Sequence, residues 1–157
     1  MGNQQERLIW LAGFIDGEGY LGVKKVKHDN IYSGYQLTAR VIISNTNEEA
    51  LKFMESILKE NEVYYSIRYP KLEPHWKPAY KIEIQNHNPA SKLLNLVSPY
   101  LVVKKEQAKI LLDFIERRRT AHTSRYTAED IGAWQRIKEL NQVSSETIRQ
   151  NAEKRKI

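Results

Sequence analysis

Four segments of the chain alternate between apolar and polar side chains, which is the pattern of β-strands that bury only one face. They cover residues 20–28, 35–44, 62–69 and 79–85. The clearest of them, YQLTARVIIS, places apolar side chains at every second position: Leu37, Ala39, Val41 and Ile43. Because each strand keeps one polar face, the pattern predicts an antiparallel sheet that helices cover on one side.

Helical spacing of apolar residues separates and flanks these strands. The expected helices cover residues 5–16, 48–60, 89–97, 104–119, 127–141 and 145–156. The resulting order is αββαββα followed by further helix, which defines an α+β fold. No linker rich in Gly, Ser or Pro divides the 157 residues, so we expect one domain, with a core at about 5–119 and C-terminal helices at about 127–156.

The charge balance favours a polyanionic partner. The chain carries 25 Lys and Arg against 19 Asp and Glu, a formal net charge of +6, which points to nucleic acid. The absence of cysteine excludes disulfides and thiolate metal sites. No apolar run is long enough to cross a membrane and no secretory signal is visible. We therefore expect a soluble protein with no membrane partner and no small-molecule cofactor. The sequence does not identify its compartment, and a prokaryotic cytoplasm and an organelle matrix or stroma both fit it.

Basic, amide, hydroxyl and aromatic side chains dominate the polar sheet face and the loop that joins its last two strands. Such side chains pair with base edges and phosphates in DNA grooves. The candidates for DNA contact are Lys24, His28, Gln36, Thr38, Arg40, Tyr64, Ser66, Arg68, His75, Lys77 and Lys81. Each one alone also fits an ordinary solvated surface, and it is their shared bias, with acids nearly absent, that favours DNA.

The stretch LAGFIDGEG, residues 11–19, places glycines and two acids at the end of the first helical segment. A glycine inside a helix costs about 1 kcal/mol relative to alanine, so Gly13 requires a reason. The stretch closely resembles the signature of the LAGLIDADG homing endonucleases, with Phe14, Gly17 and Glu18 in place of Leu, Ala and Asp. The resemblance extends to the αββαββα order and to PYLVVKKEQA at 99–108.

The resemblance implies a catalytic acid and its metal. Members of the family pack two signature helices together, and each helix presents an acid that holds divalent metal ions at the scissile phosphates. Carried over by position, Glu18 is the catalytic, metal-binding acid and the Gly17 carbonyl is a second ligand. Asp16 is expected to steady the helix junction instead. The implied cofactor is Mg²⁺, or Mn²⁺ or Ca²⁺ in the same sites.

The resemblance also implies two supporting catalytic residues. Lys104 matches the lysine that stabilises phosphate charge or orients water in the family, although the adjacent Lys105 fits almost as well. Asn45, at the end of the second strand, matches a polar residue that organises water. Asn45 is equally suited to capping the helix that follows it.

Only one copy of the signature occurs in the chain, and single-motif members of the family assemble as homodimers. The resemblance therefore implies a two-fold interface on the first helix, formed by Leu8, Leu11, Ala12, Gly13 and Ile15. The expected activity is intron-homing cleavage of a long pseudo-palindromic DNA site, leaving 3′ overhangs. The alternatives are a non-cleaving DNA-binding regulator or RNA-splicing maturase on the same fold, and an unrelated basic monomer in which the motif occurs by chance.

Overall fold

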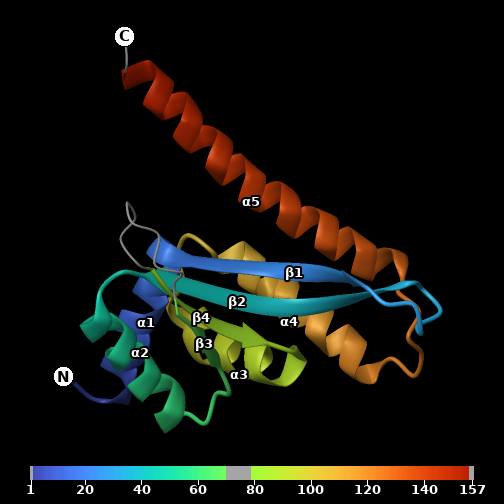
Figure 1. Cartoon of the computed structure of the whole chain (residues 1–157), viewed down its shortest axis with the longest axis horizontal. Coiled ribbons are helices and arrows are strands. Elements are labelled where there is room, and N and C mark those ends of the chain that lie inside the picture. Colours follow the sequence, from blue (N-terminus) through green and yellow to red (C-terminus); the bar gives the residue numbers. More distant parts are fainter. Residues whose placement is uncertain (1, 70–78, 156–157) are drawn as a thin grey trace.

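The computed structural model describes residues 2–69 and 79–155, without the side chains of 143–148. The elements follow the expected αββαββα order with one further helix (Figure 1). They are α1 (Gln4–Glu18), β1 (Gly19–Lys27), β2 (Tyr35–Asn45), α2 (Glu48–Glu60), β3 (Ser66–Arg68), β4 (Tyr80–Gln85), α3 (His87–Val97), the 3₁₀ turn η1 (Ser98–Tyr100), α4 (Lys105–Thr120) and α5 (Ala128–Arg155).

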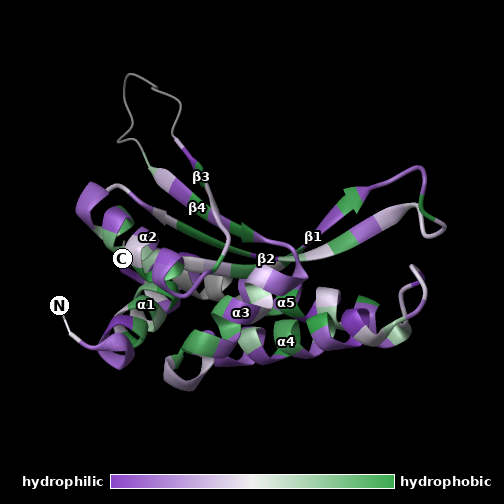
Figure 2. Ribbon diagram, turned by 90° about the horizontal axis from the view of Figure 1, so that it is seen from below, coloured by the Kyte–Doolittle hydropathy of each residue, from purple (hydrophilic) through white to green (hydrophobic). Residues whose placement is uncertain are grey.

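The sheet confirms the predicted α+β class. Its four strands run in the order β1-β2-β4-β3, and all neighbours are antiparallel. Figure 2 shows that the sheet is curved and that helices α1 to α4 lie on one of its sides. The β1–β2 hairpin is longer than β3 and β4. Strand β1 pairs with residues 35–43 of β2, whereas β4 pairs with β2 only from Arg40 to Asn45. The far end of this hairpin therefore extends beyond the other strands.

The core lies between the sheet and the helices, where the alternating apolar residues of the strands meet the apolar sides of the helices. In β2, Leu37 is 1% exposed and Ala39, Val41 and Ile43 are fully buried, as the alternation predicts. The opposite face of the same strand carries the half-buried or exposed side chains of Gln36, Thr38 and Arg40. The alternation thus predicted correctly which face of this strand is covered.

Two predicted boundaries differ from the structure. The strand expected at 62–69 pairs only over Ser66–Arg68, because the chain just before it closes the end of α2. There the backbone N–H of Glu62 donates to Lys59 at 3.1 Å and that of Val63 donates to Leu58 at 2.9 Å. The helices expected at 127–141 and 145–156 form the single helix α5. No Gly or Pro lies between 133 and 155 to interrupt it.

Helix α5 contacts β1 and α4 through its first half, where Asn141 donates to the Leu21 carbonyl at 3.1 Å. Its second half extends away from the rest of the protein (Figure 1). Within the described part of the chain, no helix is both long and apolar enough to span a membrane.

Candidate active site

Helix α1 ends with Glu18 and continues into β1 without a loop. The transition requires Gly19, because a Cβ at this position would lie 2.7 Å from the Ile15 carbonyl oxygen. The Gly19 N–H closes the last turn of the helix by donating to that same carbonyl. Glu18 is consequently exposed at the point where the helix meets the sheet.

The other acid of the motif, Asp16, holds the segment that precedes α4. Its Oδ2 accepts the backbone N–H of Val102 at 2.8 Å, and its Oδ1 accepts those of Val103 and Lys104 at 3.1 and 3.0 Å. These bonds join residues 86 to 88 positions apart in the chain. The expectation that Asp16 steadies this junction is confirmed, and Glu18 is the acid of the motif that faces solvent.

Lys104 lies beside the end of the signature helix. Its Nζ donates to the Asp16 carbonyl oxygen at 2.6 Å. Burial lowers the pKa of the Lys104 ammonium from its usual value, whereas the negative charges of Asp16 and Glu18 act in the opposite direction. The ammonium is therefore held against the end of α1 by the Asp16 carbonyl oxygen, and the described residues form no ion pair between it and a carboxylate.

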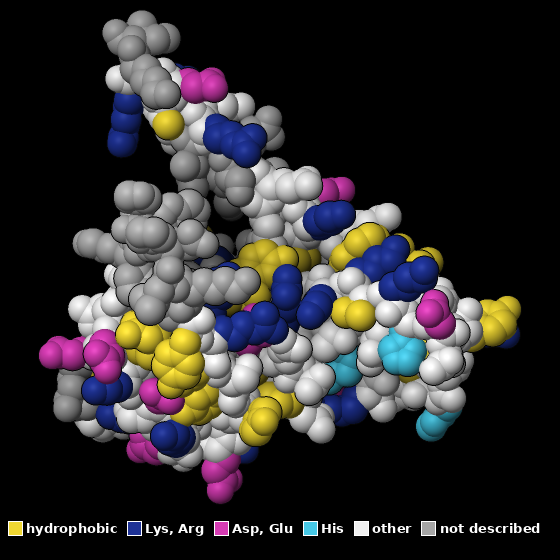
Figure 3. Space-filling view, in the orientation of Figure 1, with side chains coloured by type: hydrophobic (Ala, Val, Ile, Leu, Met, Phe, Trp, Pro, Cys, Tyr) yellow, Lys and Arg dark blue, Asp and Glu magenta, His cyan; other side chains and the backbone are white. Residues whose placement is uncertain are grey.

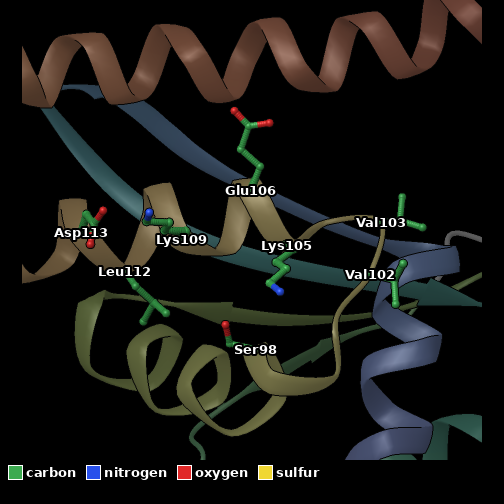
Figure 4. A pocket seen from close by; sticks show the side chains of 8 residues that line it. All are labelled: Ser98, Val102, Val103, Lys105, Glu106, Lys109, Leu112 and Asp113. Carbon is green, nitrogen blue, oxygen red and sulfur yellow. The ribbon is translucent and has the colours of Figure 1, made fainter.

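The neighbouring Lys105 faces a different part of the surface. It lines a groove of about 650 Å³ together with Ser98 of η1, Val102 and Val103 of the segment before α4, and Lys109 and Leu112 of α4 (Figure 4). In the same view Glu106 points toward α5, where it bonds Arg136 at 3.1 Å. The two candidate lysines thus diverge, and it is Lys104 that lies at the end of α1.

Asn45 lies at the same end of the sheet as Glu18, because Gly19 pairs with Ile43 two residues before it. Its Oδ1 accepts the backbone N–H of Asn47 at 2.7 Å. Asn47, rather than Asn45, is the N-cap of α2 and accepts the N–H of Ala50 at 3.0 Å. Asn45 therefore orders the turn that leads into the helix without capping it.

Strand pairing brings most of the DNA-contact candidates onto one face. Lys24 pairs with Thr38, and Arg68 pairs with Lys81. Gln36, Arg40 and Ser66 occupy matching alternate positions on the same face, so it extends over all four strands. Figure 3 shows Lys and Arg side chains gathered over β1 and β2.

Four candidates lie outside the strands. His28 lies in the β1–β2 loop, and Tyr64 is 76% exposed just before β3. His75 and Lys77 are outside the described residues.

Two residues of this face were missing from the sequence-based candidates. The Tyr20 ring lies across Gly22, where a Cβ would come within 2.4 Å of its hydroxyl, and the Arg40 guanidinium is 5.6 Å from the ring centre. Glu83 is 5% exposed and lies 3.4 Å from Arg68 Nε. Both occupy alternate strand positions, so the pattern placed them on this face, but only the cross-strand partners reveal what they contact. Among the outward-facing positions of the four described strands, Glu83 is the one acid.

A sequence model described as LAGLIDADG endonuclease matches residues 11–128, from the motif to the first residue of α5. The chain belongs to the LAGLIDADG endonuclease family. A search of curated proteins gives no match.

Solved LAGLIDADG endonucleases have the same fold. Homing endonuclease I-CvuI with its DNA target and calcium is 19% identical, with a TM-score of 0.63 over 88% of this chain and 96% of that chain. The archaeal intron-encoded I-Vdi141I complexed with DNA is 17% identical, with a TM-score of 0.59 over 88% and 99%. I-TnaI is 18% identical, with a TM-score of 0.61 over 93% and 99%.

The apolar side of the LAGLIDADG signature helix faces inward. Of the side chains expected at a dimer interface, those of Leu11, Ala12 and Ile15 are fully buried in the protomer's own core, and Leu8 is 7% exposed. They are therefore not available to a second copy. The expectation erred because an apolar stripe at helical spacing first covers the nearest sheet.

The outer side of the signature helix carries Gly13, the one exposed member of the expected interface set, and Gly17. A Cβ at either glycine would meet nothing within 4 Å, so packing inside the protomer does not require glycine there. Ile9 on the same helix is 47% exposed, and Val102 and Val103 beside its end are 81% and 68% exposed. These exposed residues with small or apolar side chains are called here the outer α1 surface.

One protomer does not assemble a complete cluster of metal ligands. In the described ranges, no three His, Cys, Asp or Glu side chains lie close enough together to hold an ion. The Glu18 carboxylate and the Gly17 carbonyl are oxygen donors at the helix end, where backbone carbonyls lack helical partners. Oxygen donors of this kind suit Mg²⁺ and Ca²⁺, and the residues present fit such an ion when DNA phosphates or a second protomer supply further ligands.

Proposed function

We propose that this protein is a site-specific endonuclease that cuts double-stranded DNA as a homodimer, by metal-dependent hydrolysis of phosphodiester bonds. The observation that carries the proposal is the exposed Glu18 carboxylate at the end of the signature helix, next to a basic sheet face. Lys104 and Asn45 lie at the same end of the sheet. An acid, a cation and a polar side chain thus converge where a bound DNA backbone would pass.

The polar face of the sheet is the proposed DNA-binding surface. Arg and Lys side chains pair with guanine, Gln pairs with adenine, and hydroxyl side chains can bond to either base. Arg40, Gln36 and Thr38 therefore suit base contacts. A strand ribbon fits the major groove of B-form DNA. The structures of I-CvuI and I-Vdi141I were determined with DNA, which supports this assignment. Tyr20 joins the proposed contact residues because its ring lies over Gly22 and beside Arg40 on the same face.

Each residue at the end of α1 has a distinct proposed role. Glu18 and the Gly17 carbonyl hold a divalent cation, and structures of I-CvuI with DNA were determined in the presence of Mg²⁺ or Ca²⁺. A bound cation of this type activates water and neutralises charge on the leaving oxygen. Lys104, rather than Lys105, places its ammonium near the phosphate and stabilises the charge that develops there. Asn45 orients water from the adjacent strand end.

Two cuts require two acids, and the second acid comes from a second copy of the chain. We assign the contact to the outer α1 surface, because glycine at 13 and 17 has no packing reason within one protomer and lets a second helix approach closely. A two-fold arrangement of this kind repeats each DNA contact in both half-sites. It implies a long pseudo-palindromic target, cut across the minor groove to leave 3′ overhangs, as in intron homing.

The proposal is tested by selection followed by cleavage. DNA that binds the protein is selected from a randomised duplex library, and cleavage of the selected sequence is followed with and without Mg²⁺. Glu18→Gln is expected to bind this DNA and to cut it at least a hundredfold more slowly than wild type. Glu49→Gln, which removes an exposed acid of α2, serves as the matched control and should cut normally.

Two other outcomes of the same experiment would contradict the proposal. Binding without cleavage under any divalent cation would assign the protein to the non-cleaving regulators. Equal cleavage by Glu18→Gln and wild type would show that Glu18 is not the metal-binding acid.

A further inference from the structure

The far end of the β1–β2 hairpin leaves one edge of β2 without a strand partner. Pairing with β4 begins at Arg40, so residues 35–39 of β2 pair only with β1. The connection between α4 and α5 lies beside this free edge (Figure 1). There the backbone N–H of Leu37 donates to the Tyr126 hydroxyl at 2.7 Å, and Ser33 Oγ donates to the Ser124 carbonyl at 3.4 Å. A side chain of the connection thus takes the place of a neighbouring strand.

Rings and cations form a continuous stack beneath this part of the hairpin. The Tyr126 ring is stacked on Tyr35, with centres 5.5 Å apart and planes at 11°. The Arg118 guanidinium lies 4.6 Å from the Tyr126 ring. On the other side, the Lys25 ammonium lies 4.5 Å from Tyr35 and 5.1 Å from Trp134. The stack joins α4, β2, β1 and α5 through cation–π contacts, each worth about 0.5–1 kcal/mol at exposed sites.

The Arg118 end of the stack is anchored firmly to the two C-terminal helices. Arg118 donates to Asp130 at 3.1 Å and to the carbonyls of Thr123 and Arg125 at 2.9 and 3.0 Å. Asp130 is 1% exposed and also accepts Arg117 at 3.0 Å. The backbone on both sides of Tyr126 is therefore tied to α4 and α5, through the Arg125 carbonyl and the Thr127 N–H, by bonds that do not involve the hairpin.

We propose that Tyr126 is a positioning residue that fixes the outer part of the β1–β2 hairpin and so controls how strictly the outer base pairs of the target are selected. The inference rests on the proposed function, because it takes the polar sheet face as the DNA surface. Lys25 and its partner Leu37 lie six residues beyond Gly19, which is about 20 Å at strand spacing. That span corresponds to about six base pairs from the catalytic acid.

The physical basis is the geometry that base contacts require. Hydrogen bonds to base edges weaken steeply once distance or angle departs from the optimum. Lys24 and Gln36 flank Lys25 and Leu37 on the opposite, DNA-facing side of the hairpin. Loss of the Tyr126 bond therefore loosens the backbone that carries them, while Glu18 and Lys104 keep their contacts at the other end of the sheet.

The test removes one hydroxyl. Tyr126→Phe keeps the stacked ring and deletes only the acceptor for Leu37. Tyr65→Phe is the matched control. It deletes a hydroxyl that donates to Glu55 at 2.8 Å, and Tyr65 directly precedes β3, the edge strand at the other end of the sheet from β1. Amide hydrogen exchange of the free, full-length protein is measured by NMR, and base preferences at every target position are measured by cleavage of a library built on the selected site.

We expect the Leu37 amide of Tyr126→Phe to exchange about fivefold faster than in wild type, the effect of losing one net hydrogen bond. The preference for the favoured base should fall about fivefold at positions near six base pairs from the cut and stay unchanged at the centre. Tyr65→Phe should show neither change. Unchanged Leu37 exchange would overturn the proposed support, and faster exchange with unaltered or uniformly weakened preferences would overturn the proposed control of specificity.

Failure of the proposed function has a separate signature. A wild-type protein that selects no DNA sequence refutes the proposed function and, with it, the role in specificity. The exchange of Leu37, which needs no DNA, still decides whether Tyr126 supports the hairpin.

Discussion

The Asp16 carboxylate provides a quantitative test of how the active site is held together. It accepts three backbone N–H groups, from Val102, Val103 and Lys104, at 2.8–3.1 Å. A hydrogen bond to a charged group contributes about 1.5–3 kcal/mol when water is excluded. Because Val102 and Val103 are exposed and water can replace part of each bond, we take about 1 kcal/mol per bond. Asp16→Ala should therefore lower the free energy of unfolding by about 3 kcal/mol.

A second variant, Asp16→Asn, removes only part of the hydrogen bonding that Asp16→Ala removes completely. Asp16→Asn keeps one carbonyl oxygen for two of the three N–H groups and loses the negative charge, so about 1.5 kcal/mol is expected. Urea unfolding followed by circular dichroism measures both values at one fixed protein concentration, since the proposed dimerisation would add to the apparent stability. Asp113→Ala, which removes an exposed acid of α4, is the control and should stay within about 0.5 kcal/mol of wild type.

The outcomes are distinct. Asp16→Ala within about 0.5 kcal/mol of wild type would refute the structural role of the carboxylate. Equal destabilisation by Asp16→Asn and Asp16→Ala would refute the assumption that the stabilisation scales with the number of backbone N–H groups that the side chain at position 16 accepts. Both variants should also cut DNA more slowly than wild type, because the segment that carries Lys104 is no longer held against α1.

Two further predictions concern the outer α1 surface and the C-terminal helices. Gly13→Leu should convert the dimer to a monomer in sedimentation velocity at micromolar protein, whereas Gly132→Leu, at an equally open helical position of α5, should leave it intact; a dimeric Gly13→Leu would contradict the assigned interface. For Asp130, burial acts to raise its pKa, but bonds from Thr127 and Arg117 and the charge of Arg118 outweigh it and bring the pKa below the usual 3.8. Its stabilisation is present above that value and is lost as pH falls through the folded pKa. Asp130→Asn should thus destabilise the protein by about 3 kcal/mol at pH 7 and flatten the fall in melting temperature between pH 4 and 2, and a variant whose acid limb matches wild type would contradict this account.

Local patterns predicted most of the fold. Alternation in β2 correctly assigned its buried and exposed faces, and helical spacing correctly placed α1, α2 and α4 to within a few residues. The family signature identified Asp16 as a structural residue, which its three bonds to the 102–104 backbone confirm. The strand faces and helix positions depend on neighbouring residues in the chain and are therefore visible in the sequence, whereas the role of Asp16 came from the family resemblance and its partners lie 86 to 88 positions away.

Contacts between distant segments were not predictable in the same way. Nothing near Tyr126 in the sequence indicates that its hydroxyl meets a backbone N–H 89 positions away. The role of Glu83 was likewise hidden, because its partner Arg68 lies on a different strand. Such pairs arise only once strand order and register bring the segments together.

The sequence by itself determined the order of helices and strands, the polar face of the sheet and the motif that ends in Glu18, because each depends on periodicity or on a short local pattern. The tertiary structure alone decided what covers the apolar side of α1. Periodicity shows that a helix has an apolar side, and it does not show which surface will bury it. The protomer's own core covers Leu11 and Ile15, so the side of α1 that remains for a second copy is the one that carries Gly13 and Gly17.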